Sequence, residues 1–280
     1  MRNILTAIHD LVMNDARNVS PSFKENSNRI NAVGDNLEEH IKNAFAGSLG
    51  MIAIEERLEK YNQTFSWTGN TNNPPDFMIQ GGDAVEVKKI GGLRSQIQLN
   101  SSYPKKTLHA DSPMITDSCR TSEIWSEKDL LYCIGSVQQR VLKRLWMIYG
   151  DCFVATAKTY TRVADAVTDG IINTGLELNK TNELARVNKV DPLGVTSLRV
   201  RGMWIVQHPD VIFRDHIYEE EATKSLHVLM LKAKFDSFPE SDRQSVLALP
   251  DDSFSIRELK IPSPDNPANL MDAIYVTGVL

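Results

Sequence analysis

The segment from 76 to 90 constrains the fold more than any other stretch, because it reads as two short strands joined by a tight turn. Charged and apolar residues alternate within it, so Val85 and Val87 point to one face of a strand while Glu86 and Lys88 point to the other. The glycine pair at 81 and 82 supplies the turn. The pattern predicts a sheet with its valines in a core and its charges toward solvent or a cleft.

The elements on either side of this segment predict an α/β (α+β) fold. Apolar residues recur at helical spacing over 4–12, 32–45 and 52–61, ahead of most of the strand candidates. This order indicates one central mixed β-sheet flanked by helices, and no linker divides the chain, so we expect a single domain over 1–280. Further strands are expected at 64–67, 96–100, 130–137, 142–149, 195–206, 225–231, 253–261 and 273–279, a helix at 156–172 and a polar loop at 20–29.

Charge and cysteine content narrow the class of protein. The net charge of −5 argues against a passive nucleic-acid coat protein, although a nuclease is compatible with it, because catalytic carboxylates add negative charge. Three widely spaced cysteines form no CxxC pair and no disulfide framework. No stretch approaches the roughly 20 apolar residues that cross a bilayer. We therefore expect a cytoplasmic protein with no membrane partner.

Asp76, Glu86 and Lys88 form the pattern with the clearest chemistry. If the two strands pair through the glycine turn, the carboxylate of Asp76 approaches that of Glu86, with Lys88 on the same face. Neighbouring carboxylates repel unless a cation intervenes, and Mg²⁺ takes one or two carboxylates together with substrate phosphate. The set therefore suits metal-assisted phosphodiester hydrolysis, in which the amine orients water or stabilises charge. An ordinary solvated Glu–Lys pair on a strand also fits this pattern.

The stretch Pro75-Asp76 … Glu86-Val87-Lys88 resembles the PD-(D/E)xK motif of restriction-type nucleases. The wider sequence is similar to the NgoPII-type type II restriction endonucleases. The matching stretches lie at 34–39, 69–76, 82–90, 99–105, 186–193 and 199–204, in the family's order, and the tail beyond about 215 resembles the family less clearly. The resemblance implies a restriction-endonuclease-like fold, with a catalytic core at about 30–150 and DNA-recognition elements at about 95–125 and 180–210.

The same resemblance implies an activity and partners. It implies a homodimeric, Mg²⁺-dependent endonuclease that cuts both strands of double-stranded DNA at a short palindrome, with the family's namesake site, GGCC, as the expected target. A cognate DNA methyltransferase would then protect host DNA. Asp76 and Glu86 are the implied metal ligands and Lys88 their amine partner. Glu38, on the preceding helix, is a candidate outer ligand, although a solvent-facing acid fits this position equally well.

Two polar sets are candidates for DNA contact. The first follows the catalytic strand, and its short polar side chains and lysine suit phosphate contacts or a strand-capping loop. In the second, Arg199 and Arg201 share one face of a strand and could each donate two hydrogen bonds to guanine, or could form surface salt bridges. The candidates are Asn100, Ser101, Ser102 and Lys105 in the first set, and Arg186, Asn188, Lys189, Arg199 and Arg201 in the second.

Two other functions fit parts of this pattern. A DNA-binding or scaffold protein with a catalytically degenerate nuclease core would keep the fold without cutting. A structure-directed or RNA-directed nuclease of the same fold would cut without reading a sequence. The intact set of Asp76, Glu86 and Lys88 favours a sequence-specific endonuclease over the degenerate protein.

Overall fold

The computed structural model describes most of the chain. The described residues are 1–14, 29–70, 73–99, 102–139, 141–179, 181, 183–218, 221–250 and 254–280, with side chains left out at 29–36 and 222. The loop predicted at 20–29 lies outside them, apart from the first residue of a helix at Arg29. Among the described residues, no helix is long and apolar enough to cross a membrane.

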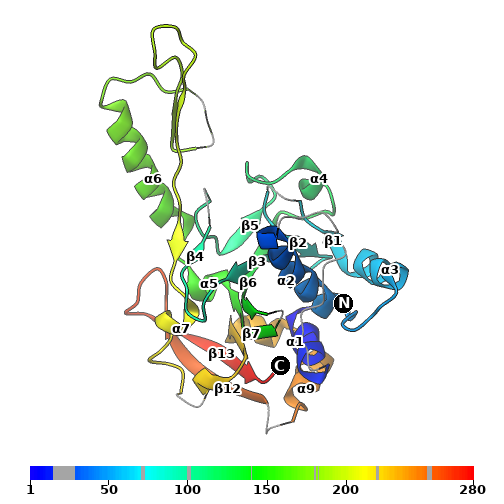
Figure 1. Ribbon diagram of the computed structural model, residues 1–280. Helices are drawn as coiled ribbons and strands as arrows, with labels where there is room; N and C mark the ends of the chain where they lie inside the picture. The colour runs from blue at the N-terminus through cyan, green and yellow to red at the C-terminus, as the bar shows by residue number, and fades with distance from the viewer. Residues whose placement is uncertain are drawn as a thin grey trace.

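A large mixed sheet forms the centre of the molecule (Figure 1). Its strands are β1 (Phe65–Trp67), β2 (Phe77–Ile79), β3 (Ala84–Ile90), β5 (Thr107–His109), β6 (Glu127–Gln138), β7 (Val141–Tyr149), β11 (Leu226–Leu231), β12 (Phe254–Pro262) and β13 (Leu270–Gly278). They lie in the order β1-β2-β3-β6-β7-β11-β13-β12, with β5 paired to β6. The pairs β3–β6 and β7–β11 are parallel and the others antiparallel, which confirms the predicted mixed sheet.

Helices flank the sheet, as the sequence pattern predicts, with the exception of α6 (Ala157–Ile172), which lies outside the body (Figure 1). They are α1 (Ile4–Met13), α2 (Arg29–Ala46), α3 (Ile54–Thr64), α4 (Asp117–Arg120), α5 (Gly150–Phe153), α6 (Ala157–Ile172), α7 (Pro209–Ile212), α8 (Lys232–Ser237) and α9 (Glu240–Leu247), with one 3₁₀ turn, η1 (Glu221–Thr223). The long helices predicted at 4–12, 32–45, 52–61 and 156–172 are confirmed with small shifts at their ends.

Both faces of the central strands are buried. Along β6 and β7 successive side chains enter two separate cores, so Cys133 and Met147 pack on one face while Ile134 and Trp146 pack on the other. The first core also contains buried residues of α1, α2 and α9. Because both faces are covered, these strands read as nearly continuous apolar runs rather than as alternating ones. The sheet is therefore a rigid platform for any group placed on β3.

The prediction of one continuous strand over 195–206 is wrong. The structure has β9 (Leu198–Val200) and β10 (Ile205–Val206), separated by four residues without strand pairing. The partner changes at this break, because β9 pairs with β8 (Ala185–Val187) and β10 pairs with β4 (Ile97–Gln98). The alternation of side chains indicates a strand but does not indicate its pairing partner. The sequence pattern therefore did not predict the break between β9 and β10.

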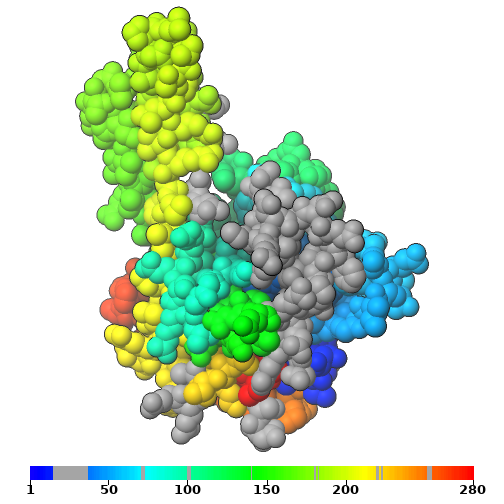
Figure 2. Space-filling model, viewed as in Figure 1, coloured from blue at the N-terminus to red at the C-terminus, as the bar shows by residue number. Residues whose placement is uncertain are grey.

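An arm projects from the body and consists of α6 and the β8–β9 hairpin (Figures 1 and 2). None of the sixteen residues of α6 is buried. The hydroxyl of Thr168 on α6 donates to the carbonyl of Leu184 at 2.8 Å and joins the helix to the hairpin. The chain returns to the body through β10, where Leu99 N–H donates to the carbonyl of Trp204 at 2.9 Å. The arm is thereby tied to the segment that follows β3.

Candidate active site

Asp76 is held against β3 by the backbone. The β2–β3 hairpin pairs Phe77 with Val85, which confirms the predicted pairing through the glycine turn. The N–H of Asp76 donates to the carbonyl of Val85 at 3.1 Å, and the N–H of Val87 donates to Oδ2 of Asp76 at 2.6 Å. These bonds place the carboxylate of Asp76 beside the backbone that carries Glu86.

Gly69 makes room for this arrangement. It has φ +87°, and a Cβ at this position would lie 2.1 Å from the carbonyl oxygen of Asp76. No side chain fits so close to a backbone oxygen, and positive φ is itself costly for residues other than glycine. Glycine at position 69 therefore allows the loop before β2 to pack directly on Asp76.

Glu86 and Lys88 lie side by side on the polar face of β3, as their spacing predicts. Nζ of Lys88 donates to Oε1 of Glu86 at 2.5 Å, and both side chains are mostly buried, with 23% and 16% of the Lys88 and Glu86 side chains exposed. The second oxygen, Oε2 of Glu86, is buried and has no hydrogen-bond partner among the described residues. A buried carboxylate oxygen without a donor is unfavourable and indicates an acceptor for a ligand.

The electrostatics of the three groups are coupled. Burial and the charge of Glu86 raise the pKa of Asp76 to about 8, although Lys88 opposes this change. Burial works against the charge of Lys88, but the carboxylates of Glu86 and Asp76 raise its pKa above the ordinary value. The site therefore resists carrying both carboxylate charges at once, because one ammonium does not fully offset their repulsion. A cation bound between the carboxylates would relieve it.

The donor set fits Mg²⁺. Mg²⁺ prefers oxygen ligands and binds through one or two carboxylates, keeping waters and taking substrate phosphates. Asp76 and Glu86 supply two such carboxylates, and Oε2 of Glu86 has no other partner in the described structure. Across the described residues, no group of three or more His, Cys, Asp or Glu side chains is arranged to hold a metal. An ion at this site would thus depend on water and substrate for its other ligands.

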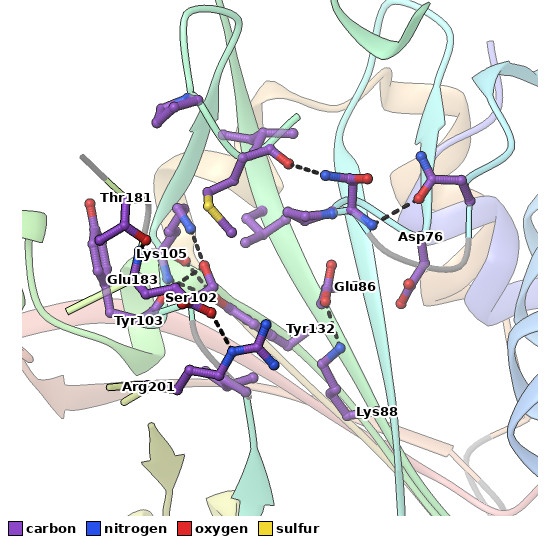
Figure 3. A pocket seen from close by; sticks show the side chains of 18 of the residues that line it. Asp76, Glu86, Lys88, Ser102, Tyr103, Lys105, Tyr132, Thr181, Glu183 and Arg201 are labelled. Atoms are coloured by element: carbon purple, nitrogen blue, oxygen red, sulfur yellow. Dashed lines mark hydrogen bonds and ion pairs between the residues drawn. The ribbon is translucent and has the colours of Figure 1, made fainter. Parts of the chain in front are cut away.

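These three residues share one pocket with residues of the loop at 102–105 and of the arm (Figure 3). The pocket has a volume of about 540 Å³. Its polar lining includes Asp76, Glu86, Lys88, Ser102, Tyr103, Lys105, Tyr132, Thr181, Glu183, Arg186, Arg199 and Arg201. The structure therefore brings three of the four predicted catalytic residues and five of the nine predicted DNA contacts to one cavity, although they come from separate parts of the sequence.

Tyr132 links the loop at 102–105 to β3. It lies opposite Glu86 in the parallel β3–β6 pair. Its hydroxyl accepts from the N–H of Lys105 at 2.8 Å and donates to the carbonyl of Lys105 at 3.0 Å. Nζ of Lys105 donates to Oγ of Ser102 at 2.5 Å, and burial lowers the pKa of Lys105 although Glu86 opposes this change. Sequence reasoning missed Tyr132, because only strand register places it next to Glu86.

The hairpin of the arm carries the cationic side of the pocket. Arg186 lies directly opposite Arg199 in the β8–β9 pair. Glu183 binds both Arg199 and Arg201, and these contacts lower the pKa of Glu183 to about 2. Glu183 was also missed by sequence reasoning, because a lone glutamate ahead of a short strand gives no signal.

Other predicted residues lie away from the pocket lining. Glu38 accepts from Nζ of Lys42 at 2.5 Å, yet its charge still contributes to the raised pKa of Asp76. Asn188 accepts from Nε of Arg186 at 3.0 Å, while Lys189 occupies the turn of the hairpin with φ 54°. Asn100 and Ser101 lie outside the described residues.

Comparison with known proteins finds two sequence matches that extend over most of the chain. The sequence profile of the NgoPII restriction endonuclease family matches residues 2–262. The chain is 40% identical over 279 residues to the type II restriction enzyme NgoPII of Neisseria gonorrhoeae, an alignment that covers 98% of this chain and 99% of that enzyme. No solved structure matches the chain. Both sequence matches run through the pocket and the arm.

Proposed function

The chain belongs to the NgoPII restriction endonuclease family, and we propose that it cuts both strands of DNA at a short palindromic, G/C-rich sequence in a Mg²⁺-dependent reaction. As a member of this family it is a type II restriction enzyme, a site-specific deoxyribonuclease that acts on double-stranded DNA. The observation that carries the proposal is the single pocket in which two carboxylates and a lysine face three arginines.

Asp76, Glu86 and Lys88 are the proposed catalytic residues. Mg²⁺ held by the two carboxylates would supply positive charge to the scissile phosphate and lower the pKa of a bound water. Lys88, whose pKa is raised by its acidic neighbours, is an ammonium at neutral pH. An ammonium donates hydrogen bonds and cannot take up a proton. We therefore assign Lys88 to orienting water and stabilising charge on the phosphate oxygens, rather than to general-base catalysis.

Ser102 and Lys105 are the proposed phosphate contacts, and the arginines the proposed base readers. Phosphate contacts position a duplex, and base contacts specify the sequence. An arginine donates two hydrogen bonds to O6 and N7 of guanine, and such a pair is worth roughly 1–3 kcal/mol of discrimination. Arg186, Arg199 and Arg201 would supply these donors for the guanines of GGCC, the target that we propose.

The remaining partners follow from the proposed reaction. The described residues of one chain contain one set of Asp76, Glu86 and Lys88, and cutting both strands of a palindrome calls for two sets related by a two-fold axis. We therefore propose a homodimer. We also propose a cytoplasmic location, where a cognate DNA methyltransferase would protect the host's own sites.

A digestion experiment tests the proposal. Plasmid DNA of known sequence is incubated with the protein and Mg²⁺, with EDTA as the metal-free control and Glu86→Ala as the control for a contaminating nuclease. We expect discrete fragments whose ends map to GGCC, only with Mg²⁺ and only with the unaltered protein. Retained binding without cleavage would point to a degenerate DNA-binding or scaffold protein. Smears or junction-dependent products would contradict sequence-specific cutting.

A further inference from the structure

We propose that Glu183 is a specificity-determining positioning residue, which fixes the guanidinium of Arg201 for end-on donation to a guanine. The inference rests on the proposed function and deepens it, because it names a residue that neither the family match nor the sequence pattern assigns. It is carried by the hydrogen bonds within the arm and by the place of the three side chains in the pocket.

The two arginines use Glu183 differently. Arg199 binds it side-on, with Nε donating to Oε2 at 2.8 Å and Nη2 donating to Oε1 at 2.6 Å. Arg201 donates to Oε1 through Nε alone. Its two terminal nitrogens, Nη1 and Nη2, have no hydrogen-bond partner among the described residues. They form the fork that matches the two acceptors on the edge of guanine.

The exposed fractions of the side chains distinguish Arg201, which is free to contact DNA, from Glu183, which holds it in place. The Arg199 and Arg201 side chains are 54% and 59% exposed, whereas that of Glu183 is 11% exposed. All three line the pocket that holds Glu86, and Figure 3 shows Arg201 joined to Glu183 there. Both oxygens of Glu183 already accept hydrogen bonds from arginine. Glu183 already accepts three hydrogen bonds from the two arginines and is mostly buried, so it is placed to hold Arg201 rather than to accept from a cytosine itself.

Charge gives Glu183 a second effect on selectivity. Arg186, Arg199 and Arg201 would together attract any phosphate backbone, whatever its sequence. The carboxylate of Glu183 offsets one of these three positive charges, so it weakens sequence-independent binding. Removing that charge while keeping the shape should strengthen binding to unrelated DNA and at the same time release Arg201 from its fixed orientation.

Glu183→Gln tests the inference against Glu177→Gln. Glu177 is an exposed glutamate on the same arm, before β8, and it does not pair with Arg199 or Arg201. Its substitution by glutamine removes the same charge without touching the contacts of the two arginines. Binding is measured in EDTA, to prevent cutting, on a GGCC duplex and on duplexes with a guanine replaced by adenine. Cutting rates are then measured on the same duplexes with Mg²⁺.

For Glu183→Gln we expect the preference for GGCC over the altered duplexes to fall by about 5- to 100-fold, the range that a bidentate arginine–guanine contact provides. Affinity for unrelated DNA should rise. The fall of this affinity with salt concentration should become steeper, by up to about the amount that one added phosphate contact gives. Glu177→Gln should keep the preference of the unaltered protein, and Glu183→Asp, which keeps the charge, should restore part of it.

An unchanged preference in Glu183→Gln, or an equal loss of affinity on every duplex, would overturn the inference. So would an unaltered protein that shows no preference in binding. Thermal unfolding of each variant separates these outcomes from damage to the fold. If the unaltered protein binds GGCC selectively but never cuts, the proposed function fails while the binding ratios still decide the role of Glu183.

Discussion

The ring of Tyr103 stacks on that of Tyr160, with centroids 5.6 Å apart and planes inclined by 17°. Tyr103 belongs to the loop at 102–105 that lines the pocket, and Tyr160 belongs to α6 of the arm. Trp204 closes the cluster edge-on, 6.3 Å from Tyr103 and 5.5 Å from Tyr160. The loop, helix α6 and the segment that leads from the arm into β10 therefore meet at three aromatic rings, and the arm's position is coupled to the pocket through them.

Tyr160→Ala should weaken this connection. Two aromatic pairs are lost, each worth roughly 0.5–1.5 kcal/mol beyond its buried area. We expect affinity for the cognate duplex to fall by about tenfold, as measured by titration in EDTA. Tyr160→Phe is the control, because it keeps both ring contacts and loses only the hydroxyl that accepts from Ala155 N–H at 2.9 Å. Equal affinity of the alanine variant and the unaltered protein would show that the cluster does not position the arm.

Glu86→Ala and Asp76→Ala should each abolish cutting while leaving DNA affinity within a few-fold of the unaltered protein. Each variant loses a carboxylate that we assign to Mg²⁺. Lys88→Ala should cut far more slowly, because the remaining carboxylates can still hold the metal. Single-turnover cleavage at saturating DNA measures all three. Full activity in either carboxylate variant would remove that residue from the site.

Divalent metal should stabilise the folded protein without DNA. Burial and the charge of Glu86 raise the pKa of Asp76 in the metal-free protein, so a divalent cation would stabilise the charged form of both carboxylates, and a ligand that binds only the folded state raises the melting temperature with its concentration. We expect Mg²⁺ or Mn²⁺ to raise the melting temperature of the unaltered protein and not that of Glu86→Ala. Glu55→Gln on α3, whose side chain is exposed, is the matched control and should respond as the unaltered protein does. A metal response that survives Glu86→Ala would place the ion elsewhere.

Lys105→Ala should reduce affinity for cognate and unrelated DNA by the same factor. Nζ of Lys105 lies 4.9 Å from the ring centre of Tyr103 and beside Ser102, in a position we assign to a phosphate contact. Loss of one such contact lowers the salt dependence of binding by about one phosphate. Titrations at several salt concentrations give the slope. A loss confined to the cognate duplex would instead make Lys105 a base reader.

Acid should destabilise the fold through two buried histidines. Burial lowers the pKa of His208 and of His227 to about 4, well below the ordinary value of 6.5. Between pH 6.5 and 4 these histidines bind protons in the unfolded chain but remain neutral in the folded chain. The free energy of unfolding therefore falls as the pH drops from 6.5 toward 4. The expected slope is roughly 1 kcal/mol per pH unit for each histidine.

Denaturant unfolding at pH 7.5, 6.5 and 5.5 measures this slope. In His227→Gln the slope should be smaller, because the glutamine does not titrate. An exposed histidine, His109, provides the control variant His109→Gln, which should keep the slope of the unaltered protein. If His227→Gln retains the full slope, other groups account for the acid sensitivity.

The sequence was most informative where local patterns determine geometry. Alternation along β3 places Glu86 and Lys88 on one face, and the glycine turn pairs β2 with β3, so the neighbourhood of Asp76 follows from a short segment. Very short elements such as β5 and α7 have no period to detect. Tyr132 and Glu183 reach the pocket through strand register and the path of the arm, which no local pattern records.

Because no side chain of α6 is fully buried and most are exposed, the arm adds little to the stability of the central sheet. If the arm reads DNA as we propose, substitutions at the exposed positions of the hairpin would change the DNA target at little cost to folding, whereas β3 packs between two cores. The arm, which we propose to determine the DNA target, and β3, which we propose to carry the catalytic residues, would then evolve at different rates within one gene. A lineage could acquire a new target by changing the arm alone, and exchanging the arm between relatives is the corresponding route for engineering.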